Sequence, residues 1–234
     1  MTERDWFAGE VAAGYDESTA DMPVEPVVDF LEPFAGGGAL ELAIGTGRIA
    51  LPLAARGVRV AGIDLSPDMV AELRRKPGGD AIHVELGDYA TTRVEGSFSL
   101  AYIVFNSINN LTTQDAQVAC FENAARHLVP GGCFAVEVGG VAGHRPLEVF
   151  DLSDTHVGVD EYDADTQRLV SHHFNLRDGQ WTRRSVPFRA VSPAELDLMA
   201  RIAGMRLRER WSGWTREPFT AASRSHVSVW EKTG

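Results

Sequence analysis

Hydrophobic and polar positions follow a regular pattern through the first half of the chain. Short apolar runs alternate with longer stretches in which apolar residues recur at helical spacing. This alternation is typical of a doubly wound α/β fold, in which helices cover both faces of a mostly parallel sheet. The runs predict five strands, over residues 39–44, 58–63, 81–85, 98–105 and 133–138.

Capping residues indicate where the helices between these strands begin and end. Gly57 is placed to end the helix that follows the first strand. Ser66 as N-cap and Pro67 at the first helical position begin the next helix. A further helix is expected from Thr112 to about Leu128.

The pattern changes between Thr155 and Ala190, where three strand-like runs occur without a convincing helix. Asp178-Gly179 separates two of these runs, and an Asp-Gly pair is a strong hairpin signal. We therefore predict an antiparallel flap over residues 151–190, inserted into a core formed by residues 1–150 and 191–234. A capping box at Ser192 then begins another helix. Two closing strands are predicted over residues 205–211 and 225–230.

Composition narrows the possible partners. The 234 residues are 44% hydrophobic and 24% charged, with a net charge of −11. A phosphate backbone would repel so acidic a chain, which argues against nucleic-acid binding. No apolar run approaches the ~20 residues of a membrane span. The N-terminus lacks the basic and apolar segments of a secretory signal. We expect a cytoplasmic protein, monomeric or homodimeric, that binds neither nucleic acid nor membranes.

A glycine loop after the first strand carries the clearest chemical signal. Glu41 is followed by Gly45 and Gly47, and Asp64 ends the next strand. Glycines let the backbone turn sharply and approach a ligand, and a carboxylate at Asp64 accepts hydrogen bonds from ribose hydroxyls. These residues predict a nucleoside site at the carboxyl edge of the sheet. The loop also fits the dinucleotide-binding pattern, so a nicotinamide-dependent oxidoreductase and a non-catalytic nucleoside-binding module remain alternatives.

The surrounding residues resemble the class I S-adenosylmethionine-dependent methyltransferases. Ala43 stands in the first motif where the family usually has glycine, and the acidic residue of the second motif is Asp64. Gly87-Asp88 matches the third motif, whose acidic residue contacts adenine in the family. The closing strands match the family's reversed seventh strand, which nicotinamide dehydrogenases lack. The flap is similar in architecture to methyltransferases that act on sugar amines.

The resemblance implies S-adenosyl-L-methionine as cofactor and transfer of its methyl group to an N or O atom of a small molecule. The residues expected to contact the cofactor are Tyr15, Glu41, Ala43, Gly45, Gly47, Arg48, Asp64, Leu65, Met69, Gly87, Asp88, Tyr89, Phe105 and Asn106. In the family, a tyrosine at the position of Tyr15 covers the sulfonium.

His172 and His173 are the candidate catalytic residues. They are adjacent on a predicted strand and therefore face opposite sides, so at least one of them is simply exposed, and the other is a candidate base toward the acceptor. No pair of carboxylates or histidines near the cofactor residues has metal-ligand spacing, and we expect no catalytic metal. The fourth strand ends at Phe105-Asn106 without the tetrad of DNA amino-methyltransferases, which argues against a DNA substrate.

Overall fold

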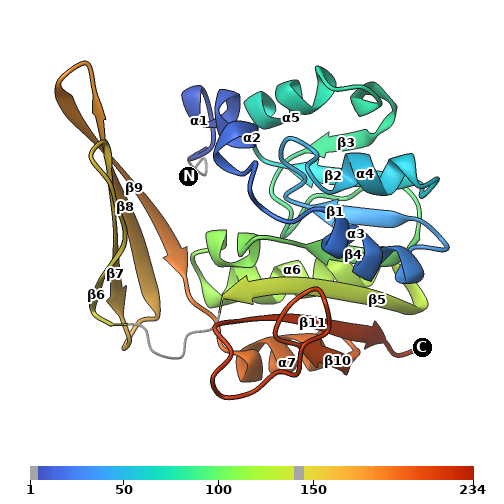
Figure 1. Ribbon diagram of the computed structural model, residues 1–234. Coiled ribbons are helices and arrows are strands. Elements are labelled where there is room, and N and C mark those ends of the chain that lie inside the picture. Colours follow the sequence, from blue (N-terminus) through green and yellow to red (C-terminus); the bar gives the residue numbers. More distant parts are fainter. Residues whose placement is uncertain (1–4, 140–144) are drawn as a thin grey trace.

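The computed structural model in Figure 1 describes residues 5–139 and 145–234. Within these ranges, seven strands form one sheet in the order β10-β11-β5-β4-β1-β2-β3. The strands are β1 (Ala39–Leu42), β2 (Val60–Asp64), β3 (His83–Leu86), β4 (Phe98–Ile103), β5 (Leu128–Gly139), β10 (Met205–Trp211) and β11 (Ser225–Lys232). Strands β1 to β5 are parallel, and β11 is antiparallel to both its neighbours. The predicted sheet with a reversed last strand is confirmed.

Helices cover both faces of this sheet (Figure 1). The described helices are α1 (Glu10–Ala13), α2 (Tyr15–Ser18), α3 (Glu25–Leu31), α4 (Ala50–Ala55), α5 (Pro67–Arg74), α6 (Gln114–His127) and α7 (Pro193–Ile202), with 3-10 turns η1 (Glu32–Phe34), η2 (Gly79–Ala81) and η3 (Ser107–Asn110). One hydrophobic cluster holds Phe121 of α6 against Trp230 of β11, with ring centroids 5.3 Å apart. A second cluster joins α3 and α4 to the sheet through Phe30 and Leu53. The sheet is therefore buried on both faces, as its apolar strands predict.

The predicted helix caps are present. The Ser66 hydroxyl accepts the Met69 N–H at 3.3 Å at the start of α5. Ser192 and Glu195 form a complete capping box at the start of α7. Gly57 follows α4 with a φ of 86°, a left-handed conformation that favours glycine.

The flap is a second, antiparallel sheet in the order β6-β7-β8-β9. Its strands are β6 (Leu147–Leu152), β7 (His156–Asp163), β8 (Arg168–Arg177) and β9 (Gln180–Arg189). Asp178 and Gly179 both have positive φ, at 50° and 74°, as a type I′ hairpin turn requires. Strand β6 was not predicted from the sequence and begins before the predicted boundary at residue 151. All its residues are exposed, so no alternation of buried and exposed positions marks it as a strand.

A buried arginine holds the base of the flap to the core. The Arg189 guanidinium donates to Gln117 of α6 at 2.5 Å and to Glu195 of α7 at 2.8 Å, and it is 7% exposed. Removing one partner of such a buried pair leaves an uncompensated charge, which costs about 3–5 kcal/mol. The flap therefore stands on a fixed base, and its strands extend away from the main sheet (Figure 1).

Two further observations bear on the sequence-based expectations. No helix in the described part of the chain is long and apolar enough to cross a membrane. Residues 1–4, on which the expectation of no secretory signal partly rests, lie outside the described residues.

Candidate functional site

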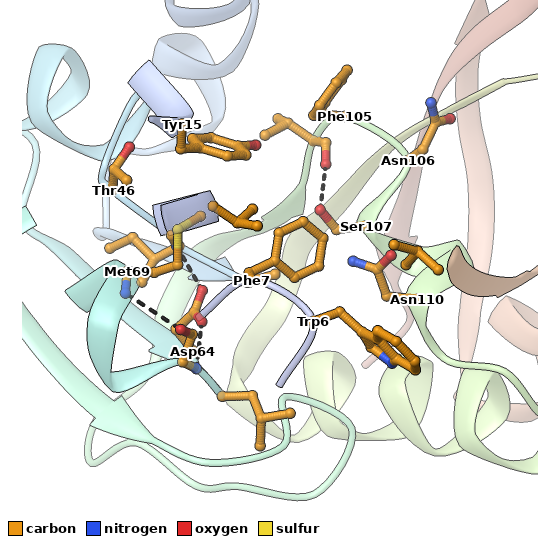
Figure 2. A pocket seen from close by; sticks show the side chains of 18 of the residues that line it. Trp6, Phe7, Tyr15, Thr46, Asp64, Met69, Phe105, Asn106, Ser107 and Asn110 are labelled. Atoms are coloured by element: carbon orange, nitrogen blue, oxygen red, sulfur yellow. Dashed lines mark hydrogen bonds between the residues drawn. The ribbon is translucent and has the colours of Figure 1, made fainter. Parts of the chain in front are cut away.

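A cavity of about 740 Å³ opens at the carboxyl ends of β1, β2 and β4. The strand order reverses between β1 and β4, and open α/β sheets bind ligands at this kind of switch point. The N-terminal segment and strands β8 and β9 of the flap complete the wall. Figure 2 shows that side chains of the N-terminal segment, such as Phe7 and Tyr15, lie near Asp64 and Met69 at the sheet edge. The volume lies in the upper half of the range for small-molecule sites, which is enough for two ligands side by side.

Glu41 is a buried carboxyl group at one end of this cavity. It is 2% exposed and accepts a hydrogen bond from the Tyr102 hydroxyl at 2.9 Å. Burial raises the pKa of Glu41 to about 8, and the hydrogen bond from Tyr102 only partly offsets this. Tyr102 lies opposite Glu41 in the β1–β4 register, a pairing that the sequence alone does not reveal.

Arg48 lines the same end of the cavity, and its Nη1 atom is buried without a hydrogen-bond partner. A buried unpaired donor on a cation is costly, so this atom is available to an anionic group of a ligand. With Glu41 nearby, this end of the cavity offers one acidic and one basic side chain, which suits a ligand that carries both an ammonium and a carboxylate.

Asp64 is held in place by the backbone on either side of it. Its Oδ2 accepts the Gly45 N–H at 2.6 Å, and its Oδ1 accepts the Ser66 N–H at 2.8 Å. Burial raises the pKa of Asp64, against the effect of these hydrogen bonds. Each carboxylate oxygen has a second acceptor site, so the group remains able to accept from two ligand hydroxyls in a fixed orientation.

The first-motif position that departs from the family's glycine is strained. Ala43 lines the cavity with a φ of 62°, a left-handed conformation that costs an L-residue about 1–2 kcal/mol. Gly45 follows with a φ of 57°, and a Cβ there would lie 3.2 Å from the Met69 methyl carbon. Glycine at Gly45 avoids both the left-handed strain and this contact, whereas alanine at Ala43 is accommodated at some energetic cost.

The third motif forms another part of the wall. Asp88 Oδ1 accepts the Ala90 N–H at 2.8 Å, and the Tyr89 hydroxyl donates to the Ser107 carbonyl at 2.6 Å. Phe105 and Asn106 lie at the exposed rim, both with positive φ. The other predicted cofactor residues that line the cavity are Leu65 and Met69. Gly47 and Gly87 do not line it and shape the turns beside it.

The N-terminal segment covers the cavity and is fastened to the glycine loop. Tyr15 of α2 lines the cavity, and burial raises its pKa to about 12. The neighbouring Asp16 accepts from the Thr46 hydroxyl at 2.6 Å and forms an ion pair with Lys76. Lys76 also donates to the Thr46 carbonyl at 2.8 Å. These contacts fix the position of Tyr15 beside the loop, and Figure 2 shows Tyr15 close to Thr46.

Several lining residues were missed from the sequence. Trp6 and Phe7 project into the cavity from the segment before α1 (Figure 2). Arg184 and Phe188 reach it from β9. Their approach depends on long-range contacts, such as the hydrogen bond from Arg184 to the Trp6 carbonyl at 3.1 Å. No local pattern marks such residues.

The two candidate histidines lie on opposite sides of β8. His173 lines the cavity, whereas His172 contacts the Ser185 hydroxyl at 2.8 Å and Glu161 at 3.4 Å outside it. Burial and the positive charge of Arg184 lower the pKa of His173 to about 4, so its imidazole is neutral near pH 7. Of the two, His173 is therefore placed to accept a proton from a ligand. The described residues include no group of three or more histidine, cysteine or acidic side chains arranged to hold a metal.

Comparisons with known proteins agree with this geometry. A model of the methyltransferase domain family matches residues 39–132. The solved structure of the CcbJ methyltransferase from Streptomyces caelestis has a TM-score of 0.83 and 36% sequence identity, and the match covers 96% of each chain.

Two curated relatives extend the comparison. The cypemycin N-terminal methyltransferase of a Streptomyces species is 27% identical over 210 residues, which are 86% of this chain and 85% of that protein. A dTDP-3-amino-3,6-dideoxy-alpha-D-glucopyranose N,N-dimethyltransferase of Streptomyces fradiae is 32% identical over 155 residues, which are 66% of this chain and 57% of that protein. These matches decide between the three functions left open by the glycine loop, in favour of a methyltransferase.

Proposed function

Since this chain belongs to the class I S-adenosylmethionine-dependent methyltransferases, we propose that it methylates an amine nitrogen of a small molecule. The observation that carries the proposal is a single cavity with a cofactor-type wall at the sheet edge and a neutral imidazole, His173, on the flap wall. An amine is the acceptor class named for both curated relatives, the peptide N-terminus of one and the amino sugar of the other.

The residues present fit the cofactor. The unpaired Nη1 of Arg48 suits its carboxylate, and Glu41 suits its ammonium. The fixed carboxylate of Asp64 suits the ribose hydroxyls, and the ring of Tyr15 suits the sulfonium, because an aromatic face attracts a cation. When bound, S-adenosylmethionine supplies an activated methyl group on a positively charged sulfur.

The division of the chain into core and flap gives the two walls different tasks. We assign cofactor binding to the core and acceptor binding to the cavity-lining side of residues 151–190 together with Trp6 and Phe7. The N-terminal segment and the flap touch each other, through Arg177 with Glu10 and Arg184 with the Trp6 carbonyl. Closed together they exclude water and hold the acceptor at attack distance, an effect worth up to ~7–11 kcal/mol in favourable cases.

An amine acceptor also explains why a neutral base is useful. Most aliphatic amines are protonated near pH 7, and an ammonium has no lone pair with which to attack. His173 is neutral at this pH and lines the cavity, so it can accept a hydrogen bond from the acceptor, and it can take the proton once the pKa of the ammonium is itself lowered by burial and by the nearby charge of Arg184. The apolar side chains of Val186 and Phe188 beside it favour the uncharged form of the amine.

Mass spectrometry of a defined acceptor panel tests this proposal. We would incubate the protein and S-adenosylmethionine with dTDP-3-amino-3,6-dideoxyglucose, with its 3-hydroxy counterpart and with a short peptide bearing a free N-terminus. Methylation of an amine and not of the hydroxy sugar is expected. The matched control is the Asp64→Ala variant, which should be inactive on every acceptor. Methylation confined to the hydroxyl compound would overturn the assignment to nitrogen.

A further inference from the structure

Three side chains of the flap form a continuous hydrogen-bonded chain from the surface to the cavity. Asp151 Oδ2 on β6 lies 2.5 Å from His156 Nδ1 on β7. His156 Nε2 lies 3.1 Å from His173 Nδ1 on β8, and the two rings stack at 5.3 Å with an interplanar angle of 23°. The Asp151 side chain is 49% exposed, and His173 lines the cavity. The chain therefore connects bulk water with the acceptor side of the site.

The ionised end of this chain determines where each ring carries its proton. Asp151 is ionised, because its hydrogen bond with His156 lowers its pKa, so it can only accept. His156 therefore carries its proton on Nδ1, and its Nε2 has a lone pair. That lone pair accepts from His173, whose proton is consequently on Nδ1. The remaining nitrogen, His173 Nε2, is left as an acceptor and lies 3.4 Å from the Ser171 hydroxyl.

We propose that Asp151, His156 and His173 form a proton relay that carries the proton of the acceptor ammonium from the closed cavity to bulk water. The relay rests on the proposed function, because it gives the proton released by an amine acceptor a way out while the cavity is closed. His173 is the group that touches the acceptor, and His156 and Asp151 act through it.

The proton transfers through the relay return both histidines to their starting state in each turnover. The ammonium N–H bond breaks as Nε2 of His173 gains the proton and the nitrogen keeps the electron pair. His173 passes its Nδ1 proton to Nε2 of His156, and His156 passes its own Nδ1 proton to Asp151, which releases it to water. After product release, water in the open cavity removes the Nε2 proton of His173, the Nε2 proton of His156 moves back to Nδ1 of His173, and water at Asp151 supplies a new proton to Nδ1 of His156. Both rings then regain their starting tautomers.

The charges around the relay disfavour a proton that stays on His173. Arg184 of β9 faces His173 and, together with burial, keeps its imidazole neutral. His156 adds to this lowering when charged, Asp151 opposes it more weakly from the surface side, and His172 adds a still smaller repulsion. Phe150 of β6 packs its edge against His173 at 5.5 Å and limits access of water from that side. Because a proton is not retained on His173, transfer from the acceptor must be coupled to transfer through His156 to Asp151 and water.

The flap also contains a matched control. His172 of β8 and Glu161 of β7 form a second histidine–carboxylate pair at 3.4 Å, outside the cavity. Both carboxylates are well exposed, with Asp151 at 49% and Glu161 at 63%. Their truncation should therefore perturb the fold to a similar and small extent, while only Asp151 belongs to the relay.

The first test needs no acceptor. Nitrogen-15 NMR of histidine-labelled protein saturated with S-adenosylhomocysteine reports the tautomer of each ring and the exchange of its proton with water. We expect Nδ1–H on both His156 and His173, and exchange of the His173 proton that slows in Asp151→Ala but not in Glu161→Ala. A proton on Nε2 of His173 in the wild-type protein, or equal exchange in both variants, would overturn the relay.

The second test separates failure of the relay from failure of the proposed function. With the panel amine that wild-type protein methylates fastest, Asp151→Ala should lower kcat about tenfold, a fraction of the usual contribution of acid–base catalysis. KM for the amine and affinity for S-adenosylhomocysteine should not change, and the solvent isotope effect on kcat should increase. Glu161→Ala should match wild type. Equal losses in the two variants would refute the relay, whereas correct tautomers and exchange without methylation of any amine would refute the proposed function alone.

Discussion

The two walls of the cavity are built in different ways. On the sheet side, Asp64 is fixed by main-chain N–H groups of Gly45 and Ser66, so the backbone itself holds the ligand-binding group. On the flap side, the ligand-facing residues are held by side-chain contacts with distant parts of the chain. One example is the hydrogen bond from Arg184 to the Trp6 carbonyl, across 178 residues of sequence. A wall held by the backbone suits the cofactor, which is the same for every acceptor. A wall held by side chains can be altered by substitution to fit a new acceptor without disturbing the cofactor wall.

Replacing the flap with a linker is the strongest test of the difference between the two walls. Leu147, Glu161, Val170 and Pro187 lie in one row across the four strands, so the ends of a 147–186 deletion are about 14 Å apart. A Gly-Ser linker of about ten residues spans roughly 17 Å and closes the gap. This design keeps Arg189 and its bonds to the core. Transfer to the acceptor should be lost entirely, because the acceptor wall is gone.

Affinity for S-adenosylhomocysteine, measured by calorimetry, should stay within a few fold of wild type in this linker variant. Circular dichroism provides the control for folding. A folded variant that no longer binds S-adenosylhomocysteine would show that the flap belongs to the cofactor site, and the separation of the two walls would be wrong.

The sheet side could be predicted from the sequence much further than the flap side. Gly45, Asp64 and Asp88 all follow strands of a parallel sheet, and such strand ends meet at one edge whatever the details of packing. The partner of Glu41 could not be predicted, because Tyr102 becomes its neighbour only through the β1–β4 register. Strand β6 is exposed along its whole length, so no alternation of buried and exposed positions marked it as a strand.

For the histidines, the sequence predicted that neighbours on a strand face opposite sides, and the structure agrees. Which of them faces the cavity depends on how the flap packs against the N-terminal segment. The link from His173 through His156 to Asp151 depends on the pairing of three flap strands, one of which was not predicted. Long-range pairing of this kind leaves no local signal in the chain.

A substitution at Asp64 tests the sheet wall alone. Asp64→Ala removes two expected ribose hydrogen bonds, each worth ~1.5–3 kcal/mol with a charged acceptor, so affinity for S-adenosylhomocysteine should fall at least about 100-fold. The Glu161→Ala variant is the control and should bind normally. Thermal unfolding should accompany the calorimetry, since Asp64 also satisfies two backbone N–H groups. Unchanged affinity would mean that Asp64 serves only the loop.

The buried carboxyl of Glu41 predicts a pH effect that the flap wall should not show. With a pKa of about 8 in the free protein, Glu41 is protonated at pH 7. The ammonium of S-adenosylhomocysteine favours the carboxylate, so binding should release a proton, and affinity should rise by up to about tenfold per pH unit toward pH 8. Because the pKa is raised on folding, the free protein should become less stable as pH rises between about 4.5 and 8.

Calorimetry in two buffers of different ionisation enthalpy measures the proton released on binding. Glu41→Gln provides the control, because glutamine does not titrate and its variant should bind with an affinity independent of pH in this range. Proton release that persists in Glu41→Gln would assign the effect to another group and leave Glu41 without this role.

The smallest expected effect lies at Ala43, within the sheet wall. Its φ of 62° is left-handed, and glycine adopts this conformation without the steric cost of a Cβ atom. Ala43→Gly should therefore stabilise the protein by about 1 kcal/mol, after the greater entropy of glycine in the unfolded chain is subtracted, and raise Tm by roughly 2–4 °C. Ala200→Gly, a buried position inside α7, is the control and should destabilise, because glycine there only loses helix propensity and packing. Thermal unfolding of the three proteins decides the matter: if Ala43→Gly melts below wild type, the left-handed conformation is not a source of strain, and alanine has been accommodated in the loop without cost.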